Sequence, residues 1–122
     1  MKKVLVIDDD VVMYRLFQIQ VKRAGCEGYF FRDGKSAIDR LDEIKPDLAV
    51  LDYNLPDIEG DELYKIIRAN EYCAGIPVVF VTGTVHEQYL QKIKALGANA
   101  VLSKPFSPRK LQVLIKELLE ME

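Results

Sequence analysis

The sequence contains little of what would mark a secreted, membrane-spanning or nucleic-acid-binding protein. Its two cysteines, Cys26 and Cys73, stand far apart in neither metal-ligand nor redox spacing, which favours reduced thiols in a cytosolic protein. The formal net charge is -2, so no excess of basic residues is available for nucleic acid. No apolar run approaches the length of a membrane span, and the acidic residues 8–10 interrupt any signal peptide. We therefore expect a cytoplasmic protein that contacts neither membrane nor nucleic acid directly.

What the sequence does contain is the composition and periodicity of one α/β domain over residues 1–122. Hydrophobic residues make up 49% and charged residues 30% of the chain, which is ordinary for a globular domain. Short apolar runs predict strands at residues 4–7, 29–31, 48–51, 77–82 and 100–102. Apolar residues at helical spacing predict helices at residues 13–24, 37–41, 63–67, 90–96 and 111–119. This alternation predicts a five-stranded parallel sheet with five helices on its two faces.

Polar residues follow the predicted strands at the ends where sheets of this kind bind ligands. In an open α/β sheet, the carboxyl ends of the parallel strands meet at one edge, and ligands bind in the crevice there. The residues expected at this edge are Asp8, Asp9, Asp52, Thr82 and Lys104, and Asp10 is a further candidate there. Carboxylates so close together repel unless some are protonated or a cation binds, and oxygen ligands suit Mg²⁺. A cation, an ammonium and a hydroxyl around one carboxylate suit phosphoryl transfer, with Asp52 as the nucleophile.

Together these motifs resemble the receiver domain of bacterial two-component response regulators, over essentially the whole chain. The matching segments are Asp8-Asp9, Asp52 with the loop at residues 55–60, Thr82-Gly83 and Lys104-Pro105-Phe106. Each motif alone is weak, but the set is specific. The resemblance implies a flavodoxin-like, doubly wound α/β fold with strand order 2-1-3-4-5. It also implies a signalling domain that assists its own phosphorylation and dephosphorylation but is not otherwise an enzyme.

The resemblance further implies a role for each site residue. Asp52 is expected to accept a phosphoryl group from a sensor histidine kinase or a histidine phosphotransfer protein. Thr82 and Lys104 are expected to bind the phosphoryl oxygens, and the peptide bond between Lys104 and Pro105 is expected to be cis. The expected Mg²⁺ ligands are the side chains of Asp8 (partly through water), Asp9 and Asp52 and the backbone carbonyl of Asn54. Phosphorylation is expected to switch the binding of an output partner or a fused effector domain, neither of which the sequence identifies.

The sequence departs from the family pattern around the expected switch. Val101 occupies the position where similar proteins carry an aromatic residue coupled to the threonine, so the usual aromatic switch is in question while the phosphorylation chemistry is not. Gly83, where alanine is more usual, is expected to loosen the loop that moves with Thr82. Asn54 and Thr84 occupy the positions that tune phosphoryl lifetime in similar proteins, and Thr84 is too small to block water strongly. The residues that fit either core positions or an output surface are Tyr89, Leu90, Val101 and Leu111.

Other functions stay open on the residues alone. A phosphatase of the haloacid dehalogenase type uses a similar set, but it needs a second acid two residues after the nucleophile, where this sequence has Asn54. A binding module of the receiver fold that works without phosphorylation is the other alternative, although the complete acidic set argues against it. Taken singly, residues 8–10 fit a solvated helix N-terminus, and His86 fits a solvated side chain without a catalytic role. The chain is either a stand-alone receiver or the receiver part of a longer protein.

Overall fold

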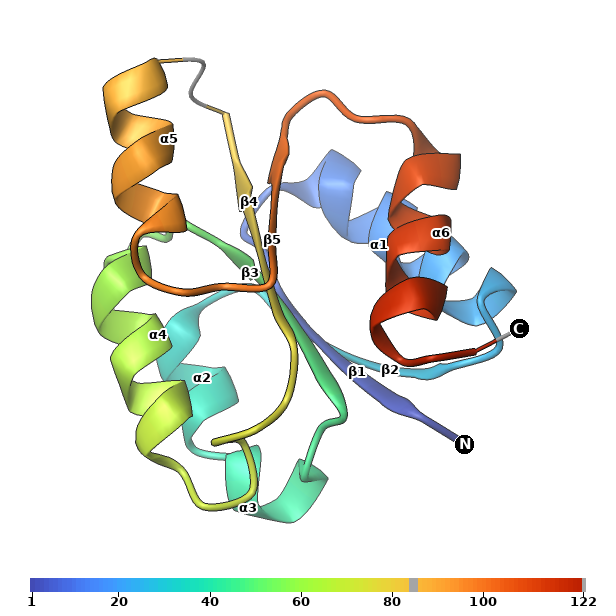
Figure 1. The fold of residues 1–122 in the computed structure, drawn as a ribbon. Helices are drawn as coiled ribbons and strands as arrows, with labels where there is room; N and C mark the ends of the chain where they lie inside the picture. The colour runs from blue at the N-terminus through green and yellow to red at the C-terminus, as the bar shows by residue number, and fades with distance from the viewer. Residues whose placement is uncertain (84–85, 122) are drawn as a thin grey trace.

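The chain forms a five-stranded parallel sheet with helices on both faces (Figure 1). The computed structural model describes residues 1–83 and 86–121. In chain order the elements are β1 (Lys3–Ile7), α1 (Val11–Arg23), β2 (Glu27–Phe31), α2 (Gly34–Ile38), α3 (Leu41–Ile44), β3 (Leu48–Asp52), α4 (Gly60–Ala69), β4 (Val78–Thr82), α5 (Glu87–Lys94), β5 (Ala100–Ser103) and α6 (Pro108–Leu118). The strand order β2-β1-β3-β4-β5 confirms the order expected from the sequence. Within the described residues, no helix has the length and apolar character needed to cross a membrane.

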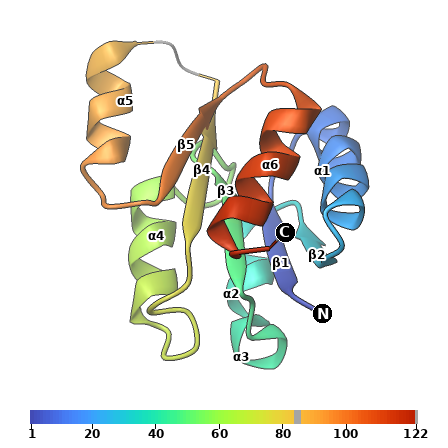
Figure 2. The same ribbon diagram turned by 45° about the vertical axis from the view of Figure 1, so that its right-hand side comes forward.

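The two faces of the sheet carry separate cores, because successive residues of a strand point to opposite sides. In β1, Leu5 and Ile7 join the core shared with α2, α3, α4 and α5, whereas Val4 and Val6 join the core shared with α1 and α6. Figures 1 and 2 show these two layers of helices on opposite sides of the sheet. Every residue of β3 and β4 is buried, which explains why these strands are continuous apolar runs in the sequence.

The second predicted helix is two short helices rather than one. The sequence predicted a single helix at residues 37–41, but α2 ends and α3 begins within that range. The Arg40 N–H bonds to the carbonyl of Ala37, only three residues back, at 3.0 Å, and this tighter turn interrupts the α-helical hydrogen-bond ladder. After α3, Lys45 adopts a left-handed backbone conformation with φ of 51° in front of Pro46, and a residue before proline is disfavoured in a helix.

Aromatic rings connect the central strands with α4 and α5. Tyr53, directly after β3, packs edge-on against Phe80 of β4 and Tyr89 of α5, with ring centroids 5.5 Å and 5.3 Å away. Phe80 also contacts Tyr64 of α4, with centroids 5.7 Å apart. Gly60, the first residue of α4, donates its N–H to the carbonyl of Tyr53 at 3.0 Å and lies against the Tyr53 ring. The close approach of α4 to this ring therefore depends on a residue without a Cβ at position 60.

We expect Gly60→Ala to lower the free energy of unfolding by about 1–3 kcal/mol, because the added methyl group would overlap the buried ring of Tyr53. Alanine is otherwise preferred to glycine in helices, so helix propensity cannot cause a loss of stability, and any loss must come from the overlap. Gly75→Ala is the matched control, because a Cβ there meets no atom within 4 Å. Urea unfolding should place the control within about 0.5 kcal/mol of the wild type. Equal stability of the two variants would contradict this packing.

Candidate functional site

The predicted polar residues come together at the edge of the sheet where the strands end, the upper edge in Figure 1. Asp8 follows β1, Asp52 is the last residue of β3, Thr82 is the last of β4, and Lys104 follows β5. Asp8, Asp52 and Thr82 are buried, with 1%, 5% and 0% of the whole residue exposed. Asp9, next to Asp8, is exposed. The parallel register of the sheet is thus what gathers these residues from distant parts of the chain.

One ammonium group joins two of the carboxylates. Lys104 Nζ lies 3.2 Å from Asp8 Oδ2 and 3.2 Å from Asp52 Oδ2. Burial by itself would lower the pKa of Lys104, but the negative charges of Asp52 and Asp8 outweigh burial and raise the pKa above its ordinary value. Lys104 therefore stays protonated, and its charge is shared between two acids.

Asp8 is the carboxylate that is least well stabilised. Its Oδ1 accepts the N–H of Asp10 at 2.8 Å, whereas its Oδ2 is within ion-pair distance of Lys104 but accepts no hydrogen bond of good geometry. Burial, with the charge of Asp52 adding to it, outweighs the Asp10 hydrogen bond and the Lys104 charge and raises the pKa of Asp8 to about 6. The site thus carries more negative charge than its own residues neutralise.

The acidic residues form a candidate cation site. One carboxylate oxygen from each of Asp8, Asp9 and Asp52 lies within 4.8 Å of the others. An all-oxygen set with an unbonded buried oxygen fits Mg²⁺, which prefers carboxylate, carbonyl and water ligands. Asp10 has a different role, because its carboxylate caps α1 by accepting the N–H groups of Val12 and Met13 at 2.9 Å and 3.3 Å. The helix-terminus interpretation of residues 8–10 therefore holds for Asp10 alone.

The two oxygens of Asp52 have different partners. Oδ1 accepts the backbone N–H of Asn54 at 2.9 Å, and Oδ2 faces Lys104. A side chain held at both oxygens has little rotational freedom, so the carboxylate is presented in one orientation. A buried, oriented carboxylate beside a lysine and an acidic cluster is an arrangement suited to accepting a phosphoryl group.

A family model described as "Response regulator receiver domain" matches residues 4–116. The chain belongs to this family. Receiver domains of response regulators are the phosphoacceptors of two-component signal transduction, as the sequence motifs implied, and they act with histidine kinases and effectors.

Two curated relatives and one solved structure illustrate the match. The chain is 34% identical over 118 residues to the alkaline phosphatase synthesis transcriptional regulatory protein PhoP of Bacillus subtilis, covering 97% of this chain but 48% of that protein. It is 30% identical to the polar-differentiation response regulator DivK of Brucella anthropi, covering 97% of this chain and 96% of DivK. The chemotaxis response regulator CheY4 of Vibrio cholerae superposes with a TM-score of 0.88 at 28% identity, covering 97% of this chain and 98% of CheY4. The chain thus spans about half of one relative and nearly all of another.

The predicted switch residues of this receiver domain lie around the ends of β4 and β5. The carbonyl of Thr82 accepts the N–H of Lys104 at 2.7 Å, which ties the ends of the two strands together. The Lys104–Pro105 peptide bond is cis, as the resemblance implied. Gly83 is exposed, and a Cβ added there would meet no atom within 4 Å. Thr84 lies outside the described residues.

An aromatic contact to the loop after Asp52 comes from α5, a contact that sequence reasoning missed. Val101 is half-buried, pairs in register with Phe80 and packs against the core shared with α4 and α5. The Tyr89 hydroxyl donates to Asn54 Oδ1 at 3.2 Å, although 35 positions separate the two residues. No periodicity in the sequence reports such a contact, because it depends on the direction in which α5 faces the loop.

The same loop is held to α2 by Asp57, whose role the sequence also did not reveal. Its carboxylate accepts the N–H groups of Gly34 at 3.0 Å and Lys35 at 2.9 Å. These two hydrogen bonds lower the pKa of Asp57 below its ordinary value, because they stabilise the ionised carboxylate. An acid after a proline in a turn-rich segment was the available signal, but its partners lie 23 and 22 positions away.

We expect Asp57→Asn to lower the free energy of unfolding by about 1 kcal/mol at neutral pH, since an amide offers one acceptor where the carboxylate offers two, in a solvent-exposed place. The folded pKa lies below the ordinary value of 3.8, so the stabilisation is complete above that value and is lost as the pH falls through the folded pKa. Urea unfolding at a series of pH values checks this. A difference between wild type and variant that persisted at the acid end would contradict it.

Proposed function

We propose that Asp52 receives a phosphoryl group from a sensor histidine kinase or a histidine phosphotransfer protein. The observation that supports this most directly is the Lys104 ammonium, 3.2 Å from oxygens of both Asp52 and Asp8. In the transfer, an Asp52 oxygen forms a bond to phosphorus while the P–N bond of the donor phosphohistidine breaks, leaving its electron pair on the imidazole. The negative charge of the phosphoryl oxygens then gives the ammonium a partner beyond the two carboxylates.

The proposed Mg²⁺ ligands are the carboxylates of Asp8, Asp9 and Asp52 and the backbone carbonyl of Asn54. The clustering of the three carboxylates and the unbonded Asp8 Oδ2 support this assignment. When bound, the ion supplies positive charge that neutralises phosphoryl oxygens and the acids around them. Asp8 and Asp9 thus serve to hold charge next to Asp52 rather than to react.

Lys104 and Thr82 are the proposed ligands of the phosphoryl oxygens. Lys104 already contacts Asp52, and the buried Thr82 ends the neighbouring strand with its carbonyl bonded to the Lys104 N–H. A hydroxyl and an ammonium that turn toward the phosphoryl group favour one of two arrangements of the loops that carry them. Gly83 directly after Thr82 has no Cβ, so we expect it to restrict the backbone next to Thr82 less than the alanine that is more usual there.

The domain over residues 1–122 is proposed to act as a cytoplasmic signalling module rather than as a turnover enzyme. Its output partner, or an effector fused to it, would bind the face formed by α5, β5 and α6, where Val101 is half-buried. The net charge of -2 and the two free cysteines accord with a cytoplasmic domain that makes no direct contact with nucleic acid or membrane.

Incubation with acetyl phosphate and Mg²⁺ should add the mass of one phosphoryl group to the wild-type protein and none to Asp52→Asn, because the amide is not a nucleophile. Asp57→Asn makes the same chemical change in the same loop and should still be labelled. Intact-protein mass spectrometry measures all three. Labelling of Asp52→Asn, or multiple turnovers of a small phosphomonoester by the wild type, would contradict the proposal.

Mg²⁺ should raise the thermal unfolding midpoint of the wild-type protein, because an ion that binds only the folded state stabilises it by about 2.7 kcal/mol at a hundred times its dissociation constant. Asp9→Asn should lose this response, and it should fold normally because Asp9 is exposed. Asp10→Asn is the control, since asparagine also caps helices and Asp10 lies outside the cluster. Thermal scans with and without Mg²⁺ measure the effect, and an equal rise in Asp9→Asn would remove Asp9 from the ligand set.

A further inference from the structure

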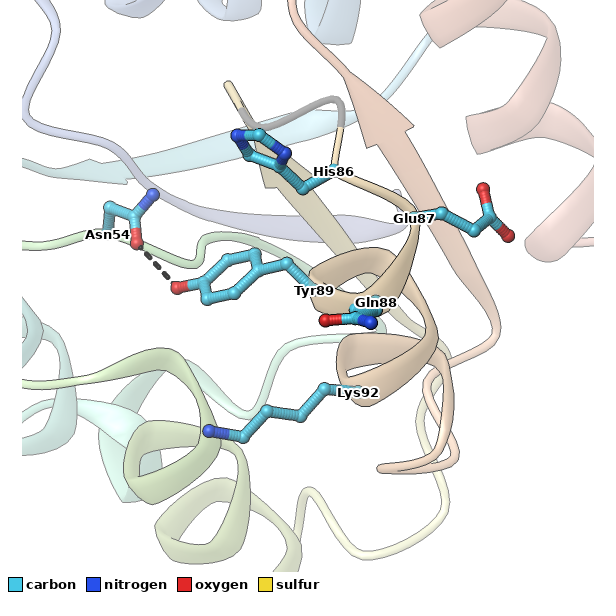
Figure 3. Close-up of a pocket in the computed structure, with 6 residues that line it drawn as sticks. All are labelled: Asn54, His86, Glu87, Gln88, Tyr89 and Lys92. Atoms are coloured by element: carbon cyan, nitrogen blue, oxygen red, sulfur yellow. Dashed lines mark hydrogen bonds between the residues drawn. The ribbon is translucent and has the colours of Figure 1, made fainter.

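A pocket of about 740 Å³ opens between the loop after β3 and the first turns of α5. The residues that line it are Asn54, His86, Glu87, Gln88, Tyr89 and Lys92. Figure 3 shows the Tyr89 ring extending from α5 toward Asn54, whereas Glu87 points away. The side chains of Tyr89 and Asn54 thus meet at the wall of this pocket, and the backbone N–H of Asn54 bonds to Asp52 Oδ1.

Tyr89 contacts both residues that directly follow Asp52. Its ring packs edge-on against Tyr53, with centroids 5.3 Å apart and the ring planes at 86°. Its hydroxyl donates to Asn54 Oδ1 at 3.2 Å, while the Asn54 N–H donates to Asp52 Oδ1 at 2.9 Å. Only one residue therefore stands between the Tyr89 hydroxyl and the carboxylate that takes the phosphoryl group.

In the structure the Asn54 amide turns its oxygen toward the Tyr89 hydroxyl and accepts a hydrogen bond from it. Because Oδ1 accepts from Tyr89, the NH₂ end is turned away from that hydroxyl (Figure 3). An amide NH₂ can only donate, so it offers no acceptor that would orient an attacking water molecule. Without the hydroxyl, the amide is free to rotate and to present its oxygen to water in the pocket.

We infer that Tyr89 is a positioning residue that slows the hydrolysis of phosphorylated Asp52 by holding the Asn54 amide in place. This inference rests on the proposed function of Asp52. In the hydrolysis, a water oxygen forms a bond to phosphorus, the bond between phosphorus and Asp52 breaks with its electron pair on the carboxylate, and the water releases a proton to solvent. The products are the Asp52 carboxylate and hydrogen phosphate, and no other reactant is consumed.

Tyr89→Phe isolates the hydroxyl, because phenylalanine keeps the ring that packs on Tyr53. After labelling with acetyl phosphate and Mg²⁺ and removal of the reagent, the variant should lose its phosphoryl group about threefold to tenfold faster than the wild type, the range that one hydrogen bond spans. Tyr72→Phe makes the same change on an exposed tyrosine between α4 and β4, and it should match the wild type. Mass spectrometry over time measures the loss, and equal rates for Tyr89→Phe and wild type would overturn the inference.

A double-mutant cycle with Asn54→Ala separates positioning from a general structural effect. In the Asn54→Ala background the hydroxyl has no amide to hold, so Tyr89→Phe should leave the rate of loss unchanged. The same acceleration by Tyr89→Phe in both backgrounds would overturn the role through Asn54. A lower thermal unfolding midpoint of Tyr89→Phe that accounts for its faster loss of phosphoryl group would overturn it too.

A second measurement examines the contact without phosphorylation. In the unphosphorylated protein, the Asn54 side-chain NH₂ signals in an amide NMR spectrum should shift in Tyr89→Phe and not in Tyr72→Phe. Unshifted signals would overturn the contact itself. A wild-type protein that takes no phosphoryl group would overturn the proposed function of Asp52, whereas normal labelling with unchanged lifetimes would overturn only the role of Tyr89.

Discussion

A single ammonium group shared between two buried carboxylates is the interaction on which this site depends. Removing ions from water is costly, and the Lys104 charge offsets that cost for Asp8 and Asp52 only in part. The part of the cost that Lys104 does not offset raises the pKa of Asp8 to about 6. The three groups follow or end β1, β3 and β5, so the packed sheet holds them at these distances. Because three carboxylates cluster at this site of the receiver domain and one ammonium pairs with two of them, the binding of a cation next to Asp52 would lower the repulsion among them.

Orientation of Asp52 depends on the loop that follows it as much as on the strand that carries it. The Asn54 N–H holds one carboxylate oxygen, and separate contacts hold the loop at its two ends. Tyr53 and Asn54 contact Tyr89 of α5 near the start of the loop, and Asp57 bonds the backbone of α2 near its end. A loop anchored to two helices on one face of the sheet holds the Asn54 N–H in a fixed position beside Asp52. In the proposed phosphoryl transfer, a hydrogen-bond donor fixed in this way would need no reorganisation to stabilise charge.

The gathering of Asp8, Asp52 and Lys104 at one edge was predictable from the sequence, because strand ends in a parallel sheet share an edge. Once the apolar runs before Asp8 and Asp52 were assigned as strands, their meeting with Lys104 followed from topology alone. The break between α2 and α3 was not predictable, because the apolar spacing of the segment fits one helix as well as two. The contacts of Asp57 and Tyr89 were not predictable either, since each joins side-chain and backbone groups of elements that are not neighbours in sequence.

The contact of Tyr89 with the loop after Asp52 matters because Val101 occupies the position where similar proteins carry an aromatic residue. Val101 is aliphatic and packs into the core, so it offers no hydrogen bond to the active-site loops. A backbone hydrogen bond between Lys104 and Thr82 links the ends of β5 and β4. Among the contacts of the described residues, Tyr89 is the side chain that connects α5 with Tyr53 and Asn54. If Tyr89 sets the rate at which Asp52 loses its phosphoryl group, a partner that moves Tyr89 on binding α5 also alters that rate. Where such a partner favours the phosphorylated state, linkage requires phosphorylation to strengthen its binding by the same factor.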